Sequence, residues 1–384
     1  MFLALTVLQS ALFLILVSRL MGGRTRRPPE APIVVAAVEP SASQATAPAE
    51  SLTMVVATLN EAHRIGPCLE GLRAQAAPVT EILIVDSGST DGTRALVEAA
   101  AQLDPRIRLV TDPPLPQGWI GKAWALQHGT TIATNPWVLG MDADTQAAPG
   151  CAAAVLAAAK REGFDVVSFA PRFDGQTHAE RFVQPALLVS LIYRSGAPGD
   201  PRVRPDRVIA NGQCFLARRS VILEHGGYEP VRQSFAEDVS LVRHLAARGV
   251  PVGFLDGSRL YRVRSYSGVR QMWREWGRSI DLKDAATSAR QLFDTAFVVL
   301  AQGAQLPIIV ALALTWPAAQ QHPLLLAATA GLLLLRSILH VAIRGSYEKR
   351  GPAWWLSPLS DPLAAVRMVL SSARRPKSWR TREY

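Results

Sequence analysis

The stretch EILIVDSGSTDGT, residues 81–93, joins a run of aliphatic residues to a loop of Asp, Ser, Thr and Gly. An unbroken aliphatic run of this length is typical of a strand that is buried on both faces. ALVEAAAQL at 95–103 follows the loop and has the composition of a helix. The stretch therefore predicts one strand–loop–helix unit of an α/β fold.

The same order of elements occurs on both sides of this stretch. SLTMVVATLNEA at 51–62 gives an earlier strand over LTMVVAT, then a polar loop and a helix. IRLVT at 107–111 and WVLGMDADT at 137–145 give a third and a fourth strand. Strands that alternate with helices predict a parallel sheet covered on both faces, with ligands bound at the carboxyl ends of its strands.

The composition of the chain indicates a membrane-associated protein. Apolar residues make up 49% of the 384 residues, the mean hydropathy is +0.14 and the net charge is +10. Much of the positive charge lies beside apolar stretches and at the C-terminus, which favours an anionic membrane surface as partner. No aromatic residues alternate with Lys and Arg as in nucleic-acid binding, so we expect no nucleic-acid partner. Cys68, Cys151 and Cys214 lack metal-type spacing and fit a reduced protein core.

Three apolar stretches, at 2–20, 296–316 and 324–343, are each long enough to span a bilayer. A cleaved signal peptide is the alternative for the first, but no basic residue precedes it. Basic residues follow the first stretch at Arg24 and the last at Arg344. The positive-inside rule then places the α/β domain and the tail in the cytoplasm, in a multi-pass protein of the cell membrane.

These stretches divide the chain into five predicted parts. They are an N-terminal transmembrane helix (1–21), a flexible linker rich in Ala, Pro and Ser (22–50), an α/β domain (51–290), two C-terminal transmembrane helices (291–345), and an interfacial or re-entrant segment with a basic tail (346–384). Within the α/β domain, the region 180–210 looks irregular, and its breaker-rich part SGAPGDPRVRPDR predicts a mobile loop.

Asp142 and Asp144 follow the fourth strand, one residue apart. In an extended segment alternate side chains share a face, so both carboxylates can bind one cation. Carboxylate oxygens suit Mg²⁺ or Mn²⁺. Paired acidic residues at a strand end are also common in solvated loops.

Other candidate ligand groups follow the remaining strands. Asp86 comes too early to cap the next helix, and its carboxylate can accept hydrogen bonds from a base or a ribose hydroxyl. Glu61 can approach the same ligand from the neighbouring loop. Lys122 lies in PQGWIGKAWAL, where Ala123 replaces the Ser or Thr of a P-loop. Lys122 can still reach a diphosphate from a helix start, or it is a solvated lysine beside a turn.

Glu237 and Asp238 open a predicted helix. Ser234 and Glu237 have the spacing of a capping box, so Glu237 is expected to close the helix start. Asp238 is then the freer carboxylate. We therefore predict Asp238 as the general base, with Glu237 as second candidate.

Four motifs, VVATLNEA, VDSGSTDGT, MDADT and AEDVSLVRHL, together resemble the family 2 glycosyltransferases of the GT-A fold, over roughly residues 51–256. The resemblance implies a nucleotide-binding α/β domain, a divalent cation on the DxD motif, and inverting transfer from a UDP- or GDP-linked sugar. It assigns the base to Asp238 and the metal to Asp142 and Asp144. The expected donor-binding residues are Thr58, Asn60, Glu61, Asp86, Lys122 and Asp142.

PLPQGWIGKAWAL, NGQCFLARR, the flanking spans and the tail PKSWRTREY resemble, more closely, membrane-associated glycosyltransferases of carotenoid and hopanoid pathways. The tail and the length favour a carotenoid acceptor over a hopanoid-pathway or other glycolipid acceptor. Processive synthases carry a QxxRW motif, whereas here QMWREW places Glu275 between Arg274 and Trp276. We therefore expect transfer of a single sugar to a lipid acceptor.

Two other classes compete with this interpretation. A nucleotidyltransferase usually has a Gly-rich loop with Arg and Lys after its first strand, where this chain has LNEAHRIG. A non-catalytic membrane scaffold would have no reason to place Asp86, Asp142, Asp144 and Asp238 at strand ends and helix starts.

Overall fold

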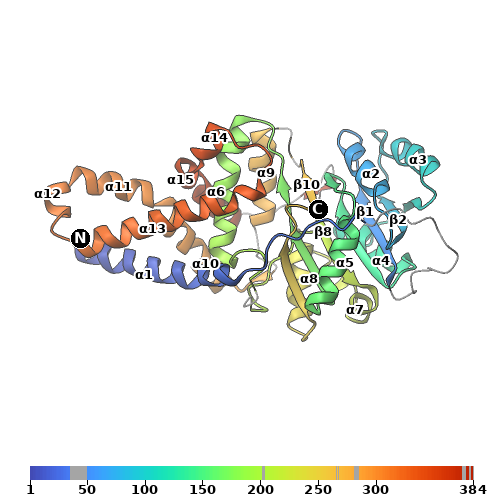
Figure 1. Cartoon of the computed structure of the whole chain (residues 1–384), viewed down its shortest axis with the longest axis horizontal. Helices are drawn as coiled ribbons and strands as arrows, with labels where there is room; N and C mark the ends of the chain where they lie inside the picture. The colour runs from blue at the N-terminus through green and yellow to red at the C-terminus, as the bar shows by residue number, and fades with distance from the viewer. Residues whose placement is uncertain are drawn as a thin grey trace. The chain divides into compact units, whose positions relative to one another are not determined.

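The computed structural model describes residues 1–34, 50–200, 204–264, 266, 268–280 and 285–373, and the backbone of 378–379 and 382–383. The chain forms two compact units (Figure 1). The helical unit comprises Met1–Arg26, Asp174–Val203 and Tyr266–Pro376. The sheet unit comprises Arg27–Phe173, Arg204–Ser265 and Lys377–Tyr384. The five predicted parts of the chain stay predictions.

A seven-stranded sheet with the order β3-β2-β1-β4-β8-β6-β9 forms the centre of the sheet unit. Its strands are β1 (Leu52–Thr58), β2 (Val79–Asp86), β3 (Ile107–Thr111), β4 (Trp137–Asp142), β6 (Val166–Ala170), β8 (Cys214–Arg218) and β9 (Val252–Asp256). The four strands predicted from the sequence are β1, β2, β3 and β4, and they pair in parallel. Their carboxyl ends therefore meet at one edge.

Helices cover both faces of this sheet (Figure 1). They are α2 (Ile65–Arg73), α3 (Thr93–Leu103), α4 (Gly121–Ile132), α5 (Cys151–Glu162), α7 (Arg219–Glu224) and α8 (Glu237–Ala246). Met54 and Val56 of β1 face a core built with α2, α3 and α5. Val55 points the other way, towards Gly129 of α4. A Cβ added to Gly129 would lie 2.5 Å from a methyl group of Val55. Burial on both faces explains why β1 is apolar without alternation.

The strand β8 runs antiparallel to both of its neighbours, β4 and β6. The predicted wholly parallel sheet is therefore wrong at this strand. Because of the reversed direction, Cys214 at the start of β8 pairs with Met141 near the end of β4. The residues that precede β8 thus lie at the carboxyl edge of β4, a long-range relationship that local sequence patterns do not reveal.

The sheet unit also contains a smaller sheet with the order β5-β10-β7, the strand pair β11 (Ser378–Trp379) and β12 (Arg382–Glu383), the 3-10 helix η3 (Glu229–Val231) and a short N-terminal segment. The small sheet contains β5 (Thr145–Ala147), β7 (Arg172–Phe173) and β10 (Tyr261–Val263). Glu30 N–H donates to the Asp256 carbonyl (2.9 Å), and Ile33 N–H donates to that of Gly150 (3.2 Å). Residues 27–34 of the predicted linker are thus bound to this unit, whereas 35–49 lie outside the described residues.

The helical unit contains the apolar stretches of the chain. Its α- and π-helices are α1 (Phe2–Leu20), α6 (His178–Ser195), α9 (Val269–Ile280), α10 (Ser288–Val298), η5 (Val299–Gly303), α11 (Gln305–Leu314), α12 (Trp316–Ala319), α13 (Pro323–Ala342), α14 (Pro352–Trp355) and α15 (Asp361–Ala373). Short 3-10 turns η1 (Met21–Thr25), η6 (Ile343–Ser346) and η7 (Ser357–Ser360) connect some of them. The helices α1 and α13 pack side by side (Figure 1).

Two helices of the described residues, Phe2–Thr25 and Pro323–Ser346, are long and apolar enough to cross a membrane. They correspond to the first and third predicted spans. The predicted span at 296–316 is a bent pair instead: Ser288–Gly303 and Gln305–Leu314 meet at 46°. The pair counts as a third candidate only if both halves form one broken span.

The region predicted as irregular contains an 18-residue helix, α6. Thr177 and Glu180 form a capping box at its start, in which each side chain bonds the other residue's backbone N–H. The prediction failed because Pro185 inside the segment favours a break, while burial of residues such as Leu187 and Tyr193 stabilises the helix. Of the loop that follows α6, residues 201–203 lie outside the described residues.

Candidate active site

The carboxyl ends of three adjacent strands bring the predicted site residues to one edge of the sheet. Thr58 of β1 pairs with Asp86 of β2, and Ala57 pairs with Asp142 of β4. The structure therefore places Thr58, Asp86 and Asp142 at the ends of neighbouring strands, as the alternation of strands and helices in the sequence predicts. Their roles depend on what each side chain contacts.

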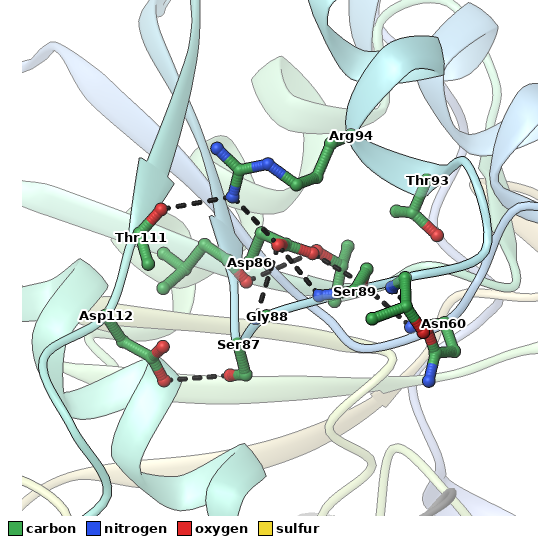
Figure 2. A network of polar contacts seen from close by, with 12 residues as sticks. Asn60, Asp86, Ser87, Gly88, Ser89, Thr93, Arg94, Thr111 and Asp112 are labelled. Carbon is green, nitrogen blue, oxygen red and sulfur yellow. Dashed lines mark hydrogen bonds and ion pairs between the residues drawn. The ribbon is translucent and has the colours of Figure 1, made fainter.

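Asp86 is completely buried and is the centre of a polar network (Figure 2). Its Oδ1 atom accepts hydrogen bonds from the hydroxyls of Ser89 (2.5 Å) and Thr58 (3.2 Å). Its Oδ2 atom accepts from the N–H groups of Gly88 (3.3 Å) and Ser89 (3.1 Å) and from Arg94 Nη1 (3.1 Å). A carboxylate offers about four lone-pair positions. Asp86 therefore holds its own loop, and a direct bond to a nucleotide would replace one of these contacts.

Asn60 connects the loop after β1 to the loop after β2. Its N–H donates to Ser89 Oγ (2.8 Å), and its side-chain oxygen accepts from Thr90 N–H (2.9 Å). Its backbone is left-handed, with φ +56°, a conformation that Asn tolerates better than most residues. The contacts shown thus give this predicted donor-binding residue a role in joining the two loops.

Glu61 is buried and forms an ion pair with Arg64, whose Nη2 lies 3.1 Å from Glu61 Oε1. Arg64 Nη1 also lies 3.6 Å from the carboxylate of Asp144. Arg64 thus places positive charge between two predicted ligand residues. Sequence reasoning missed Arg64, although its position three residues after Glu61 was visible in LNEAHR.

Asp142 and Asp144 lie where β4 ends. The strand stops at Asp142 and residues 143–144 form a turn, so the extended geometry expected across both residues is wrong. Thr145 Oγ1 donates to the Asp142 carbonyl (2.7 Å) and holds this turn. No group of three His, Cys, Asp or Glu suited to a metal ion occurs among the residues that the structure describes.

The pKa of the buried Cys68 thiol is affected by the carboxylates around this turn. Burial raises the pKa of its thiol to about 12, and the charges of Asp144, Asp142 and Glu61 raise it further, against the Thr145 hydrogen bond. The three carboxylates thus lie near this thiol, while Lys122 faces Asp142 and Arg64 faces Asp144. Cys68, Cys151 and Cys214 are all free and buried, as predicted for core residues.

Lys122 is the second residue of α4 and joins β4 to α8. Its Nζ atom lies 2.9 Å from Asp142 Oδ1 and 2.8 Å from Glu237 Oε1. Burial alone would lower the pKa of Lys122, but the charges of Asp142, Glu237 and Asp238 hold it well above the usual value. Lys122 is therefore a fixed positive charge, and the solvated lysine beside a turn is excluded.

Glu237 does not form the predicted capping box. Ser234 Oγ bonds instead with Ser240 Oγ (2.8 Å) and accepts from Ala236 N–H (3.2 Å). The side chain of Glu237 turns to Lys122 because burying an unpaired carboxylate would be costly. The prediction failed because the competing partner is 115 residues away in sequence.

Asp238 is more exposed than Glu237 and both of its oxygens are positioned by backbone. Gly212 N–H donates to Oδ2 (2.6 Å), and Val239 N–H donates to Oδ1 (2.8 Å). Burial, followed by the charge of Glu237, raises the pKa of Asp238 to about 7, while Lys122 and the two N–H groups oppose the increase. Such a carboxyl group can exchange a proton near neutral pH.

Gly212 is a site residue that sequence reasoning missed. A Cβ on it would lie 3.1 Å from Lys122 Nζ, 3.5 Å from Glu237 Oε1 and 3.6 Å from Asp238 Oδ2. Glycine therefore lets the backbone approach all three charged groups. The only signal in the sequence was the NGQ turn before the apolar CFLA.

Comparison with known proteins extends these observations. Residues 53–226 match the family model described as Glycosyl transferase family 2. Over 93 residues the chain is 39% identical to the lipopolysaccharide core biosynthesis glycosyltransferase LpsC of Rhizobium meliloti. The matched region covers 24% of this chain and 31% of that protein. Over 226 residues it is 28% identical to the N-acetylglucosaminyl-diphospho-decaprenol L-rhamnosyltransferase of Mycobacterium tuberculosis, covering 52% and 72%. The chain thus spans about a third of the first relative's length.

Among solved structures, the chain resembles the mannosyltransferase PcManGT from Pyrobaculum calidifontis, solved in complex with GDP-Man and Mn²⁺. The TM-score is 0.56 at 18% identity, over 97% of this chain and 99% of that chain. At this identity the likeness shows the fold. The predicted fold class, an α/β domain of the GT-A type with flanking apolar helices, is confirmed. Family match and fold together support a family 2 glycosyltransferase.

Proposed function

We propose that the chain transfers a single sugar from a nucleotide-diphosphate sugar to the hydroxyl of a lipid in the membrane, with inversion at the sugar carbon. One observation carries this proposal: Lys122 lies between Asp142 at the end of β4 and Glu237 at the start of α8, directly beside Asp238. Charged groups suited to a diphosphate and a carboxylate suited to proton transfer thus occupy one cluster at the ligand-binding edge of the sheet.

Asp238 is the proposed base. As the acceptor oxygen forms its bond to the sugar carbon, Asp238 takes the hydroxyl proton, and the bond from that carbon to the diphosphate oxygen breaks. A pKa near the working pH favours this role. Glu237 is the second candidate, but its carboxylate is buried and bonded to Lys122.

The remaining acidic residues fit a divalent cation. Mg²⁺ and similar ions are commonly held by one or two carboxylates together with substrate phosphates. Asp142 and Asp144 provide two carboxylates, which pair with Lys122 and Arg64 in this structure. We propose that they hold Mg²⁺ or Mn²⁺, which supplies positive charge against the departing diphosphate. The Mn²⁺ in the structure of the archaeal mannosyltransferase supports this choice.

The loops after β1 and β2 form the proposed nucleotide side of the site. Asn60 and Asp86 hold these loops in place, and Thr58 supports Asp86. Glu61, Lys122 and Asp142 complete the proposed donor-binding set. The proposed nucleotide is UDP or GDP, and the mannosyltransferase solved with GDP-Man supports a nucleotide-diphosphate sugar as donor.

The proposed acceptor is a carotenoid, with hopanoid-pathway lipids and other glycolipids as alternatives. The apolar helices α1 and α13 support an acceptor dissolved in the membrane. The mycobacterial relative, whose name specifies a diphospho-decaprenol substrate, supports a lipid-linked acceptor in general. Basic residues after both helices favour the cytoplasmic membrane with the sheet unit in the cytoplasm.

Expression of the full chain in a carotenoid-producing host tests the acceptor. Pigments are extracted and compared by mass spectrometry between hosts with the wild-type chain and with the Asp238→Asn variant. A hexose or deoxyhexose increment that appears only with the wild type supports the proposal. Unchanged pigments together with a new glycosylated lipid would replace the carotenoid by one of the alternatives.

A further inference from the structure

Every exposed residue between Pro352 and Ala373 is apolar. These residues are Pro352, Trp355, Leu356, Leu359, Leu363, Val366, Val369, Leu370 and Ala373. The opposite face of α15 is buried within the helical unit, through residues such as Ala364 and Met368. A group of exposed side chains that are all apolar marks contact with another protein or with a membrane.

The start of α15 lies beside the middle part of α13. Asp361, its first residue, forms two hydrogen bonds with Arg336, of 2.7 and 2.9 Å, and both side chains are buried. Arg336 lies six residues before Ala342, the last residue of α13, or about 9 Å along the helix axis. If α13 spans a bilayer, Asp361 lies about 9 Å inside the end of that span.

The segment between α13 and α15 returns along α13 from its end towards Arg336. The ring of Trp354 stacks on His340 at 4.0 Å, one helical turn nearer to the end of α13 than Arg336. The segment from Trp354 to Asp361 therefore runs back along α13. Gln302, at the bend of the broken helix pair, donates to Asp361 Oδ1 (2.8 Å) and satisfies the buried carboxylate further.

From Asp361, α15 leads back to polar surroundings. Arg367 donates from Nε to the Trp273 carbonyl (2.5 Å) and from Nη2 to the Arg274 carbonyl (3.1 Å) of α9. The helix α9 carries the charged residues Arg270, Arg274 and Glu275, as expected of a helix at the membrane surface. Six residues, or about 9 Å, separate Asp361 from Arg367.

We propose that residues 352–373 form a re-entrant segment that enters the hydrocarbon layer to the level of Arg336 and returns, with its exposed apolar face covered by acyl chains. The proposal rests on the membrane-bound function proposed above. At 13 residues, or about 20 Å, α15 is too short to cross a core of about 30 Å. Lipid is the favoured partner because α13, the candidate span that binds Asp361, itself exposes large apolar side chains such as Leu334 and Ile338, which are 61% and 55% exposed.

Site-specific fluorescence in vesicles tests this placement. Val366→Cys on the exposed face of α15 is labelled with bimane in the full chain and reconstituted into phosphatidylcholine–phosphatidylglycerol vesicles. Leu334→Cys on α13 is the matched membrane control, and Glu98→Cys, exposed on α3, is the aqueous control. The wild-type chain, whose cysteines are buried, gives the labelling background. Leu363→Cys repeats the reading if the Val366 variant fails to fold.

Lipids brominated on the acyl chain are expected to quench labels at 366 and 334 to a similar extent, whereas aqueous iodide quenches only the label at 98. Iodide quenching at 366, with 334 still quenched by lipid, would place α15 in water and overturn the inference. A label at 366 protected from both quenchers would indicate a protein partner, such as a second copy, and also overturn it. Iodide quenching at 334 would instead contradict the membrane-bound function itself.

Discussion

The backbone N–H of Gly212 donates a hydrogen bond to Asp238 Oδ2 at 2.6 Å. This bond joins the residues before β8 to the start of α8, and it exists because β8 runs antiparallel to β4. It fixes the orientation of the proposed base. Gly212 also lies close to Lys122 and Glu237, so this one backbone position contacts or adjoins Lys122, Glu237 and Asp238.

Replacing Gly212 by Ala is expected to reduce transfer about 10- to 100-fold, less than the full contribution of a general base of about 10²- to 10⁴-fold, because the base is displaced and not removed. The added Cβ would lie 3.1 Å from Lys122 Nζ and would displace the charged cluster by a few tenths of an ångström. Steady-state rates with wild-type and Gly212→Ala protein measure the effect. Gly66→Ala is the control, because a Cβ at that helical position meets nothing within 4 Å. Equal activity of both variants would remove Gly212 from the site.

The rate of transfer should depend on pH through Asp238. The residue accepts a proton only when ionised, so the rate is low below its pKa of about 7 and increases as the pH passes that value. The Lys122 charge lowers this pKa, so Lys122→Gln is expected to move the profile to higher pH. Lys160→Gln, an exposed lysine paired with Glu50, is the matched control. A profile of Lys122→Gln that coincides with the wild type would contradict the coupling.

Asp86 is expected to act through its loop. Asp86→Asn retains the shape of the side chain but replaces one acceptor oxygen by an NH₂ group, which cannot accept hydrogen bonds from the neighbouring N–H or O–H groups. Each donor left without an acceptor lowers the stability of the fold by about 1–3 kcal/mol. We expect a lower melting temperature and weaker nucleotide binding together. Asp165→Asn, which breaks a more exposed pair with Arg218, serves as control. Normal stability with lost binding would indicate direct nucleotide contact instead.

Asp144→Ala is expected to abolish the dependence of nucleotide binding on Mn²⁺. The substitution removes one of the two carboxylates proposed to hold the cation, whereas the hydrogen bonds of Asn60 and Asp86 in the loops after β1 and β2 do not involve Asp144. Calorimetric titration of UDP and GDP with and without Mn²⁺ measures this, with the exposed Glu98→Ala as control. Unchanged metal-dependent binding would exclude Asp144 from the site.

The sequence was informative where structure is local. The strands β1 to β4 and the strand-end positions of Thr58, Asp86 and Asp142 follow from apolar runs that end in polar loops. Parallel pairing then brings these residues together without further information. The fold class and the edge of the sheet that holds the candidate site were therefore predictable.

Long-range relationships account for what the sequence did not reveal. The direction of β8 depends on its tertiary neighbours, so the place of Gly212 beside Asp238 could not be inferred. Glu237 forms an ion pair with Lys122, which is distant in the sequence, and not the predicted capping box with Ser234. The helix α6 forms despite Pro185 because its apolar side chains are buried in the helical unit.

The central claim is that Asp238 removes the acceptor proton during sugar transfer. The most direct test uses purified wild-type and Asp238→Asn protein in vesicles, with nucleotide titration and mass analysis of glycosylated lipid on the same samples. We expect unchanged donor affinity and a loss of transfer of about 10²- to 10⁴-fold, the contribution of a general base. Full transfer by Asp238→Asn, with Glu237 intact, would contradict it.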